Sequence, residues 1–437
     1  MRKDSSMAKP AVALIRYQNS LRSLREAIEL CGGFKGLKAN DKVLIKPNLV
    51  TWSNQFSIAP YGVFTSTRLV HDMVLLLKEF GCEKIAIGEG SVVMEKEVGT
   101  QSAFKGLGYE KLSATYGVQL IDLNKSKSTQ IPLYEDFSIP VAQEALAADF
   151  LINMPVLKTH GATAVSLGIK NLKGVMKIAG KKRCHSAKRH LEFNFPILAQ
   201  KLYPQLTVID GIYMLEKGPI HIGNAIRKNI IIASRDILGV DVVGAAVMGF
   251  NAKDVKHLNF FASRTGGSID IKDYEIKGLP LDEEIQPLKW DETWNAENTG
   301  PKVFDKIGIS GIANRKFDHT LCSGCAMLPV VCNLLTISAY KGEPFDNIEV
   351  LSGKEMQAKP GFDHTILAGK CIVKANEGNP NIRHKIELKE CPPSFEHLVQ
   401  AFHDVGVAGK AEAYEGYMQK QGSKYDGNPD FDPGFFT

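Results

Sequence analysis

The chain has 437 residues, of which 44% are hydrophobic and 23% charged, so its composition is that of a folded globular protein and excludes fibrous and disordered classes. No apolar run approaches the 18 residues of a membrane-spanning helix, and residues 1–10 lack the apolar core of a secretory signal. The sequence therefore predicts a cytoplasmic protein of two or three domains without a membrane partner.

The net charge of +5 is concentrated in one stretch of the chain. Between Lys158 and His190 there are nine Lys or Arg residues and no Asp or Glu, and outside this stretch 44 basic residues face 48 acidic ones. One concentrated basic stretch suits a local anionic ligand, whereas nucleic acid is usually bound by an extended basic surface with a recognisable motif. The charge pattern favours an anionic small molecule as partner and argues against nucleic acid.

Short apolar runs alternate with amphipathic stretches over the first two-thirds of the chain. Nearly all-apolar strands that alternate with helices are typical of a largely parallel sheet covered by helices on both faces. We therefore predict an α/β fold, with an anion-binding domain at residues 1–265. Strands are predicted at residues 42–46, 84–88, 118–123, 150–154, 206–209 and 229–233, and helices at residues 66–80, 141–147 and 236–248.

The rest of the chain is predicted to hold a connector, a smaller domain and a tail. Residues 266–302 are polar and acid-rich, and we expect them to be a connector with little regular structure. Residues 303–411 are predicted to form a smaller α+β cysteine-rich domain that holds a metal cluster. Its strands are predicted at residues 348–351, 365–373 and 385–388 and its helix at residues 397–405. Residues 412–437 lack periodicity and are predicted to be an extended or loose tail.

Polar residues end or follow several predicted strands and recur in the basic stretch. Because ligands of α/β sheets bind beyond the carboxyl ends of the strands, we expect these residues to form one site. The predicted catalytic residues are Lys158, His160 and Asp210. The predicted substrate-binding residues are Lys46, Asn48, Glu89, Lys170, Asn171, Lys173 and Gly174.

The basic stretch also has helical spacing. Lys170, Lys173, Lys177 and Lys181 are spaced to share one helical face, which could present them together to carboxylate or phosphate groups. The alternative is a solvated basic helix with no ligand.

Four cysteines in the last third of the chain are predicted metal ligands. Cys322 and Cys325 form a C-x-x-C turn, Cys371 follows 46 residues later, and Cys391 precedes two prolines. Four thiolates can hold a [4Fe–4S] cluster or a zinc ion. The apolar surroundings, the Cys-Pro step and the lack of a second C-x-x-C favour the cluster, with Zn²⁺ as the alternative. The remaining interpretation is that two of these thiols are ordinary buried residues.

Several segments resemble the family known as domain-of-unknown-function family 362. They are IKPNLV at 45–50, GCEKIAIGEGS at 81–91, PVLKTH at 155–160, GIKNLKG at 168–174, VIDG at 208–211, Glu216–Pro219 and SRDILGVD at 234–241. The resemblance covers roughly residues 40–265 and implies no agreed reaction. Members of this family often carry ferredoxin-like iron–sulfur modules, and some are exported. This chain departs from them because it lacks a repeated C-x-x-C-x-x-C and an export signal.

A weaker likeness is to the nickel-pincer lactate racemases. It rests on Thr65–Arg68 and on the Gly-rich strand end at residues 88–91. The Gly-His-Arg step that follows this strand in the racemases is missing here, which argues against the same chemistry.

Taken together, these patterns favour an iron–sulfur enzyme, either an oxidoreductase or a lyase. It would bind an anionic small molecule at the lysine-rich strand ends and use the cluster for electron transfer or as a Lewis acid. One alternative is a non-catalytic electron carrier or assembly partner that docks a redox protein through the basic stretch. Another is a zinc-stabilised, nucleotide-using transferase, although the chain has no Walker-type phosphate loop.

Overall fold

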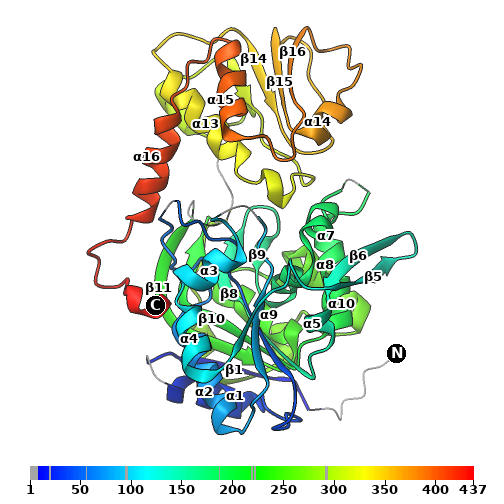
Figure 1. The fold of residues 1–437 in the computed structure, drawn as a ribbon, viewed down its shortest axis with the longest axis vertical. Coiled ribbons are helices and arrows are strands. Elements are labelled where there is room, and N and C mark those ends of the chain that lie inside the picture. Colours follow the sequence, from blue (N-terminus) through cyan, green and yellow to red (C-terminus); the bar gives the residue numbers. More distant parts are fainter. Residues whose placement is uncertain are drawn as a thin grey trace. The chain divides into compact units, whose positions relative to one another are not determined.

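The computed structural model describes residues 8–18, 21–55, 57–93, 97–186, 188–217, 220, 223–290 and 294–437. The chain folds into two compact units, and each is considered by itself (Figure 1). The first unit contains residues 1–180, 192–291 and 422–437, and the second contains residues 181–191 and 292–421. The basic segment 181–191 therefore belongs to the same unit as the clustered cysteines.

A ten-stranded sheet forms the centre of the first unit. Its strands are β1 (Ala11–Arg16), β2 (Val43–Pro47), β3 (Ile85–Glu89), β4 (Gln119–Asp122), β7 (Phe150–Met154), β8 (Val156–His160), β9 (Ala164–Ser166), β10 (Leu206–Glu216), β11 (Asn224–Ser234) and β12 (Glu275–Gly278). The order is β12-β1-β11-β10-β7-β2-β3-β4, with β8 beside β10 and β9 beside β8.

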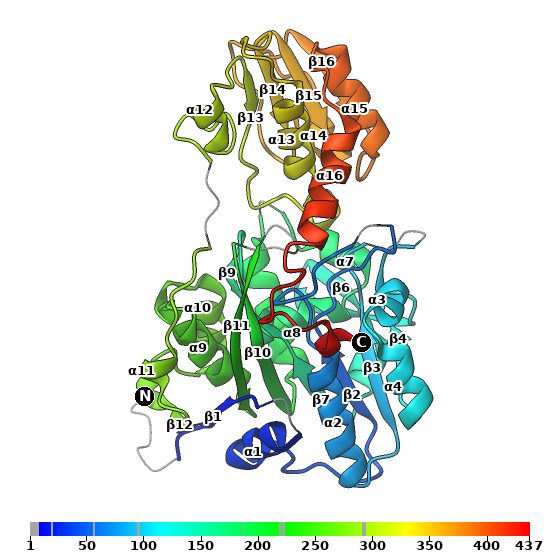
Figure 2. The ribbon, with the colours of Figure 1, turned by 90° about the vertical axis from the view of Figure 1, so that its left-hand side faces the viewer.

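Most neighbouring strands in this sheet run parallel. Strands β10, β7, β2, β3 and β4 are parallel to one another, whereas β11 is antiparallel to both β1 and β10. The two long strands β10 and β11 lie side by side (Figure 2). The predicted largely parallel sheet is confirmed, and the apolar run 150–154 coincides with β7.

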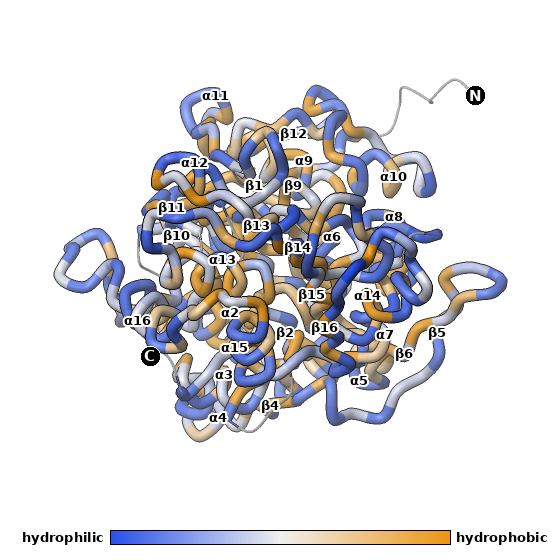
Figure 3. Tube along the Cα trace, turned by 90° about the horizontal axis from the view of Figure 1, so that it is seen from above, coloured by the Kyte–Doolittle hydropathy of each residue, from blue (hydrophilic) through white to orange (hydrophobic). Residues whose placement is uncertain are grey.

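Helices cover both faces of the sheet. They are α1 (Leu21–Cys31), α2 (Thr67–Glu79), α3 (Thr100–Gly106), α4 (Tyr109–Tyr116), α5 (Gln143–Leu146), α6 (Gly168–Asn171), α7 (Ile178–Arg183), α8 (Leu191–Leu202), α9 (Ile237–Val247), α10 (Lys256–Thr265) and α11 (Leu281–Glu284). The 3₁₀ turns η1 (Leu172–Val175), η3 (Ala252–Asp254) and η4 (Ile271–Asp273) connect some of them. Hydrophobic and hydrophilic residues are mixed along helices such as α1 and α2, as expected of amphipathic helices packed on a sheet, whereas α9 is apolar almost throughout (Figure 3).

The alternation of side chains along β1 shows how the two faces are covered. Ala13 and Ile15 pack in the core that includes Leu24 of α1. Val12, which precedes Ala13, points to the other face, where a Cβ on Gly239 of α9 would lie 3.3 Å from it. The predicted helix at residues 141–147 is wrong in its first two residues, because β6 (Phe137–Ala142) pairs there with β5 (Ser128–Tyr134), and α5 begins at Gln143.

The second unit has its own four-stranded sheet, in the order β13-β14-β15-β16, with all neighbours parallel. Its strands are β13 (Ile312–Asn314), β14 (Ile348–Leu351), β15 (His364–Ala368) and β16 (His384–Leu388). Its helices are α12 (Val303–Ile307), η5 (Ser323–Cys325), α13 (Leu328–Ala339), α14 (Lys370–Ala375), α15 (Phe395–Asp404) and α16 (Ala411–Gly422). The smaller cysteine-rich domain is therefore present. Its helices alternate with parallel strands, which is an α/β arrangement.

Two segments have more regular structure than expected. Residues 266–302 contribute β12, which pairs in parallel with β1, together with η4 and α11. Residues 412–437 contain most of α16 and the turn η6 (Pro433–Phe436), whose Phe435 and Phe436 are each 3% exposed in the core of the first unit. Among the described residues, no helix is long and apolar enough to cross a membrane.

Candidate functional site

The carboxyl ends of neighbouring strands bring several predicted site residues together in the first unit. Lys46 on β2 lies opposite Asn153 on β7, and Glu89 is the last residue of β3. Lys158 lies on β8, which pairs with β10 next to β7. Since these strands run parallel, their polar ends meet at one edge of the sheet.

Lys46 and Glu89 form a buried ion pair at this edge. Their side chains are 1% and 2% exposed, and the Lys46 ammonium lies 3.0 Å from each Glu89 carboxylate oxygen. The same oxygens accept backbone N–H groups from Leu49 and Gly90, each at 2.8 Å. Burial lowers the pKa of Lys46, and the carboxylate opposes this shift.

Amide side chains extend the ion pair into a network. The Asn171 side-chain oxygen accepts hydrogen bonds from Lys46 at 3.0 Å and from Asn48 at 2.9 Å. The Asn171 amide nitrogen donates to Asn153 at 2.9 Å. Lys158 donates to the Asn48 side-chain oxygen and to the Val63 carbonyl. The polar groups of this network therefore satisfy one another inside the protein.

Gly174 lies directly over the ion pair. A Cβ at this position would be 2.3 Å from a Glu89 carboxylate oxygen and 2.4 Å from the Lys46 nitrogen. The backbone of η1 can therefore approach the pair only because residue 174 has no side chain.

Three lysines beside the network influence one another electrostatically. Burial, together with the charge of Lys46 and against the effect of Glu89, lowers the pKa of Lys158 to about 7. Burial also lowers the pKa of Lys170 well below its usual value, and the charges of Lys173 and Lys158 add to this. Lys170 and Lys173 are partly exposed. The neighbouring amines at this edge of the sheet thus disfavour one another's protonation, and a bound anion would favour it.

Asp210 and His160 make their contacts elsewhere. Asp210 accepts hydrogen bonds at 2.7 Å from the Ser66 backbone and hydroxyl, just before α2, and at 3.0 Å from the Ile212 N–H. Burial raises the Asp210 pKa, and these donors lower it. His160 accepts the Ala162 N–H in the turn after β8. This geometry suits Asp210 to positioning α2.

Asp241 supports the network, although it is not among the predicted site residues. Its carboxylate accepts the N–H groups of Gly168 at 2.6 Å and Ile169 at 2.9 Å, where α6 begins. Burial raises its pKa to about 7. Because α6 carries Asn171, Asp241 helps to place that amide. The available signal was an acid in the middle of the otherwise apolar helix α9.

The prediction that the basic stretch forms one helical face is wrong. Lys170 lies on α6, Lys173 on η1 and Lys181 on α7. Lys177 lies between these elements and donates to the carbonyl groups of Asn124 and Ser126. Residues 218 and 219 of the family-like segment Glu216–Pro219 lie outside the described residues.

The second unit brings the four predicted metal ligands together from three segments of the chain. Cys322 and Cys325 flank the turn η5, and the Cys325 N–H donates to the Cys322 carbonyl at 3.0 Å. Cys371 lies in the first turn of α14, not in a strand as expected. Cys391 follows β16, and the Lys370 N–H bonds to the Glu390 carbonyl at 3.0 Å, which ties the last two segments together.

All four cysteines line one recess of the second unit. The other lining residues are Gly353, Lys354, Gly369, Lys370 and Glu390. A hydrogen bond between the two thiols lowers the pKa of Cys322 to about 5 and raises that of Cys325. The charges of Cys391 and Cys371 also raise the Cys325 pKa, so the four thiols interact electrostatically.

The four cysteines have the chemistry of metal ligands. In the part of the chain that the structure describes, no three His, Cys, Asp or Glu side chains are grouped closely enough to hold a single metal ion. A zinc site needs four thiolates about 2.3 Å from one point. A cluster of several irons is larger, so its cysteines stand farther apart. The donor set of four thiols around an open recess is compatible with such a cluster.

Two lysines that sequence reasoning missed lie against this recess. The Lys182 amine is 3.9 Å from the Cys391 sulfur. The Lys354 amine donates to the carbonyl groups of Lys182, at 2.7 Å, and His185. Lys354 thus holds the basic segment 181–191 beside the cysteines. Lys182 lies in the basic stretch, but no local signal indicates its contact with a cysteine 209 residues away.

The remaining cysteines are core residues. Cys332 on α13 is 3% exposed, and burial raises its pKa to about 12. Cys31 and Cys82 belong to the core of the first unit, and Cys184 is also buried. These positions agree with the expectation that Cys332 is a small core residue.

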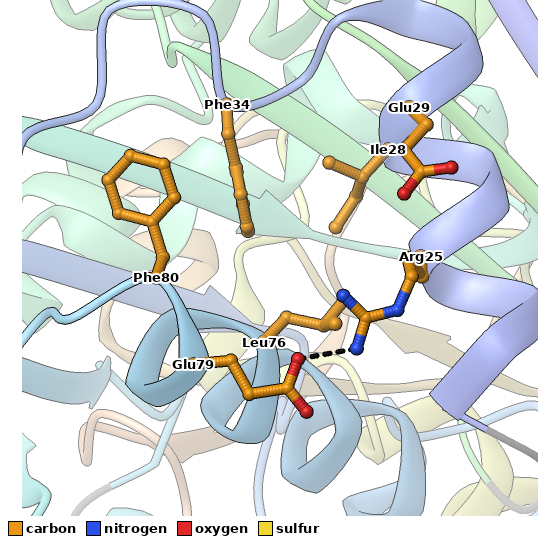
Figure 4. Close-up of a pocket in the computed structure, with 7 residues that line it drawn as sticks. All are labelled: Arg25, Ile28, Glu29, Phe34, Leu76, Glu79 and Phe80. Carbon is orange, nitrogen blue, oxygen red and sulfur yellow. Dashed lines mark hydrogen bonds and ion pairs between the residues drawn. The ribbon is translucent and has the colours of Figure 1, made fainter.

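A second recess lies between α1 and α2 (Figure 4). Arg25 and Glu79 form an ion pair across it, and Ile28, Glu29, Phe34, Leu76 and Phe80 complete its lining. Both charged side chains are more than 40% exposed, and none of the predicted site residues takes part. Nothing in this lining indicates catalytic chemistry.

The segments at the strand ends of the first unit lie in a region that matches a known protein family. Residues 43–246 match the family described as Domain of unknown function (DUF362). This DUF362 region, slightly under half of the chain, contains the whole Lys46–Glu89 network. A thylakoid-associated protein of Synechocystis is 28% identical over 248 residues, which are 53% of this chain and 73% of that protein.

The chain is also similar to a solved structure, the lactate racemase apoprotein of Thermoanaerobacterium thermosaccharolyticum. The identity is 12% and the TM-score 0.31, over 56% of this chain and 59% of that chain. A likeness at this level supports no statement about the site.

Proposed function

We propose that this protein is an iron–sulfur protein in which Cys322, Cys325, Cys371 and Cys391 hold a [4Fe–4S] cluster. The observation that carries the proposal is that four thiols from three separate segments of the chain line one recess. When bound, such a cluster would supply one-electron chemistry, and four cysteine ligands would leave no open iron for Lewis-acid chemistry. Zinc is the alternative, because four thiolates also make a structural zinc site.

Metal analysis tests this proposal directly. Full-length protein purified without oxygen should contain about four irons and four sulfides per chain and absorb near roughly 400 nm. Cys391→Ser should lose most of the iron. Cys332→Ala is the matched control, since Cys332 lies in the same unit but does not line the recess, and it should keep the iron. One zinc per chain in a colourless protein would refute the proposal.

We further propose that the DUF362 region binds an anionic substrate, a carboxylate or a phosphate, at the lysine-rich edge of the sheet. Lys46, Asn48, Glu89, Asn171 and Gly174 form the support of this site. Lys170 and Lys173 are partly exposed and are the proposed anion contacts. Lys158 is the proposed catalytic base, since its pKa of about 7 allows a neutral amine near neutral pH.

Inorganic phosphate and oxalate are suitable probes for this edge. An anion that binds the folded protein stabilises it, by about 2.7 kcal/mol at a concentration 100 times its Kd. Lys173→Gln should reduce the stabilisation, whereas Lys201→Gln, on the exposed end of α8, should not. Equal stabilisation of both variants would argue against an anion site here. The cytoplasmic location stays a prediction from the sequence.

A further inference from the structure

The recess of the second unit opens to the surface on one side. Cys322 is buried, whereas Cys371 and Cys391 are exposed. Electron transfer into or out of a cluster held by the four cysteines would therefore take place on the side where Cys371 and Cys391 are exposed.

Lysines border this exposed side. Lys182 places its amine 3.9 Å from the Cys391 sulfur, and Lys370 is the exposed residue directly before Cys371. Glu390 is an acid in the same rim, but its carboxylate accepts the Ser394 N–H at 2.7 Å and contacts His397 at 2.6 Å. The rim thus presents positive charge around the two exposed cysteines.

The basic segment is held in place by the fold. Lys354 donates to the carbonyl groups of Lys182 and His185, so its amine anchors the segment and does not face outward as a contact. A Cβ on Gly324 would lie 3.2 Å from Lys182 Cε, which shows that the lysine stem packs against the C-x-x-C turn. A lysine held at an exposed edge is suited to steering a partner of opposite charge.

We propose that this rim is the docking face for an acidic one-electron carrier protein, with Lys182 and Lys370 as its main contact charges. The inference rests on the proposed cluster and identifies its partner. Exchange of one electron would oxidise one of the two proteins and reduce the other, with no bond made or broken. The compact cluster of lysines at an exposed cysteine edge favours a protein over a nucleic acid, which needs a longer row of phosphate contacts.

Equilibrium binding tests the docking face without using enzyme activity. The probe is an oxidised, acidic plant-type ferredoxin, and its Kd for the full-length protein is measured by surface plasmon resonance at about 50 and 200 mM salt. The test variant is Lys182→Gln/Lys370→Gln. The matched control, Lys341→Gln/Lys410→Gln, removes the same charge from exposed lysines near the far end of α13, roughly 18 Å from the C-x-x-C turn.

We expect the test variant to raise the Kd about tenfold at the lower salt concentration, and the control to stay within about twofold of the parent. Lys182→Glu/Lys370→Glu should abolish ferredoxin binding and create binding of basic cytochrome c, a gain that only a folded protein can show. Equal Kd values for the test variant and the control would overturn the docking inference, as would tighter binding of duplex DNA than of ferredoxin.

Iron and zinc are measured in every sample. An iron-containing protein whose variants bind as the parent does would refute docking alone. Zinc in place of iron would refute the proposed function, and the electron carrier with it.

Discussion

Replacement of Glu89 by glutamine tests what the buried ion pair contributes. Glu89→Gln keeps the side chain's size but removes the charge facing Lys46, which is only 1% exposed. Each Glu89 carboxylate oxygen accepts one backbone N–H group. In the variant, the side-chain amide nitrogen takes the place of one of these oxygens and must face an N–H group whose hydrogen bond it cannot accept. Loss of one partner from a buried pair costs about 3–5 kcal/mol, and we expect a decrease of about 4 kcal/mol in the free energy of unfolding.

The pH dependence of this decrease gives a second signature. Burial lowers the pKa of Lys46, and the Glu89 carboxylate opposes the shift, so its removal lowers the folded-state pKa further. In the variant, Lys46 is therefore protonated in the unfolded chain and neutral in the folded chain over a wider pH range, which ends near the unfolded pKa of about 10.4. Stability rises with pH wherever the unfolded state binds more protons. The deficit of the variant should therefore shrink as the pH rises toward about 9.5.

Urea unfolding followed by circular dichroism at about pH 7 and pH 9.5 measures both effects. Glu79→Gln is the control, because Glu79 pairs with Arg25 at the surface and is 49% exposed. Its loss should cost less than about 1 kcal/mol. A similar small cost for Glu89→Gln, or a deficit that does not change with pH, would refute the reasoning.

Three further predictions concern residues of the first unit, and one of them uses a control in α16. Gly174→Ala should destabilise the protein by about 3 kcal/mol in urea, because its methyl group would lie 2.3 Å from the carboxylate of the buried pair. Gly416→Ala, with open space in α16, should instead stabilise it slightly, and equal effects would contradict this account. Because the pKa of Lys158 is about 7 in the folded protein, the parent should gain stability between about pH 7 and pH 10. The difference in stability between the parent and Lys158→Met should therefore grow across that range. Parallel curves of stability against pH for the two proteins would disprove this. Phe436→Ala should cost about 3–5 kcal/mol in thermal unfolding, and an unchanged midpoint would show that η6 is dispensable.

The sequence was most informative where local pattern and topology agree. The run FLINM is apolar throughout and coincides with β7. Lys46 and Glu89 end neighbouring parallel strands, which is why the strand pattern alone predicts that they lie close together. The contact between them could not be predicted, since nothing local distinguishes an ion pair from two ligand-facing side chains.

Other features depend on partners that are distant in the sequence. Strand β12 has the polar sequence EIKG and becomes a strand only through pairing with β1. The run ILAGKCIV looks like one strand, but Gly369 at φ +125° ends it and α14 begins, which moves Cys371 into a helix. The positions of Lys182 and Lys354 beside the cysteines follow from contacts across more than 160 residues.

The division of the first unit among three stretches has a consequence for its synthesis. Tyr425, Phe431 and Phe435 belong to or pack against the same core as β1 and α1, but residues 292–421 are translated before them. At roughly 5–20 residues per second, the ribosome adds that intervening stretch in about 7–26 s. During this interval the aromatic surface around Tyr61 and Tyr213 has no covering segment. The nascent first unit should therefore be a chaperone client until the second unit has been made.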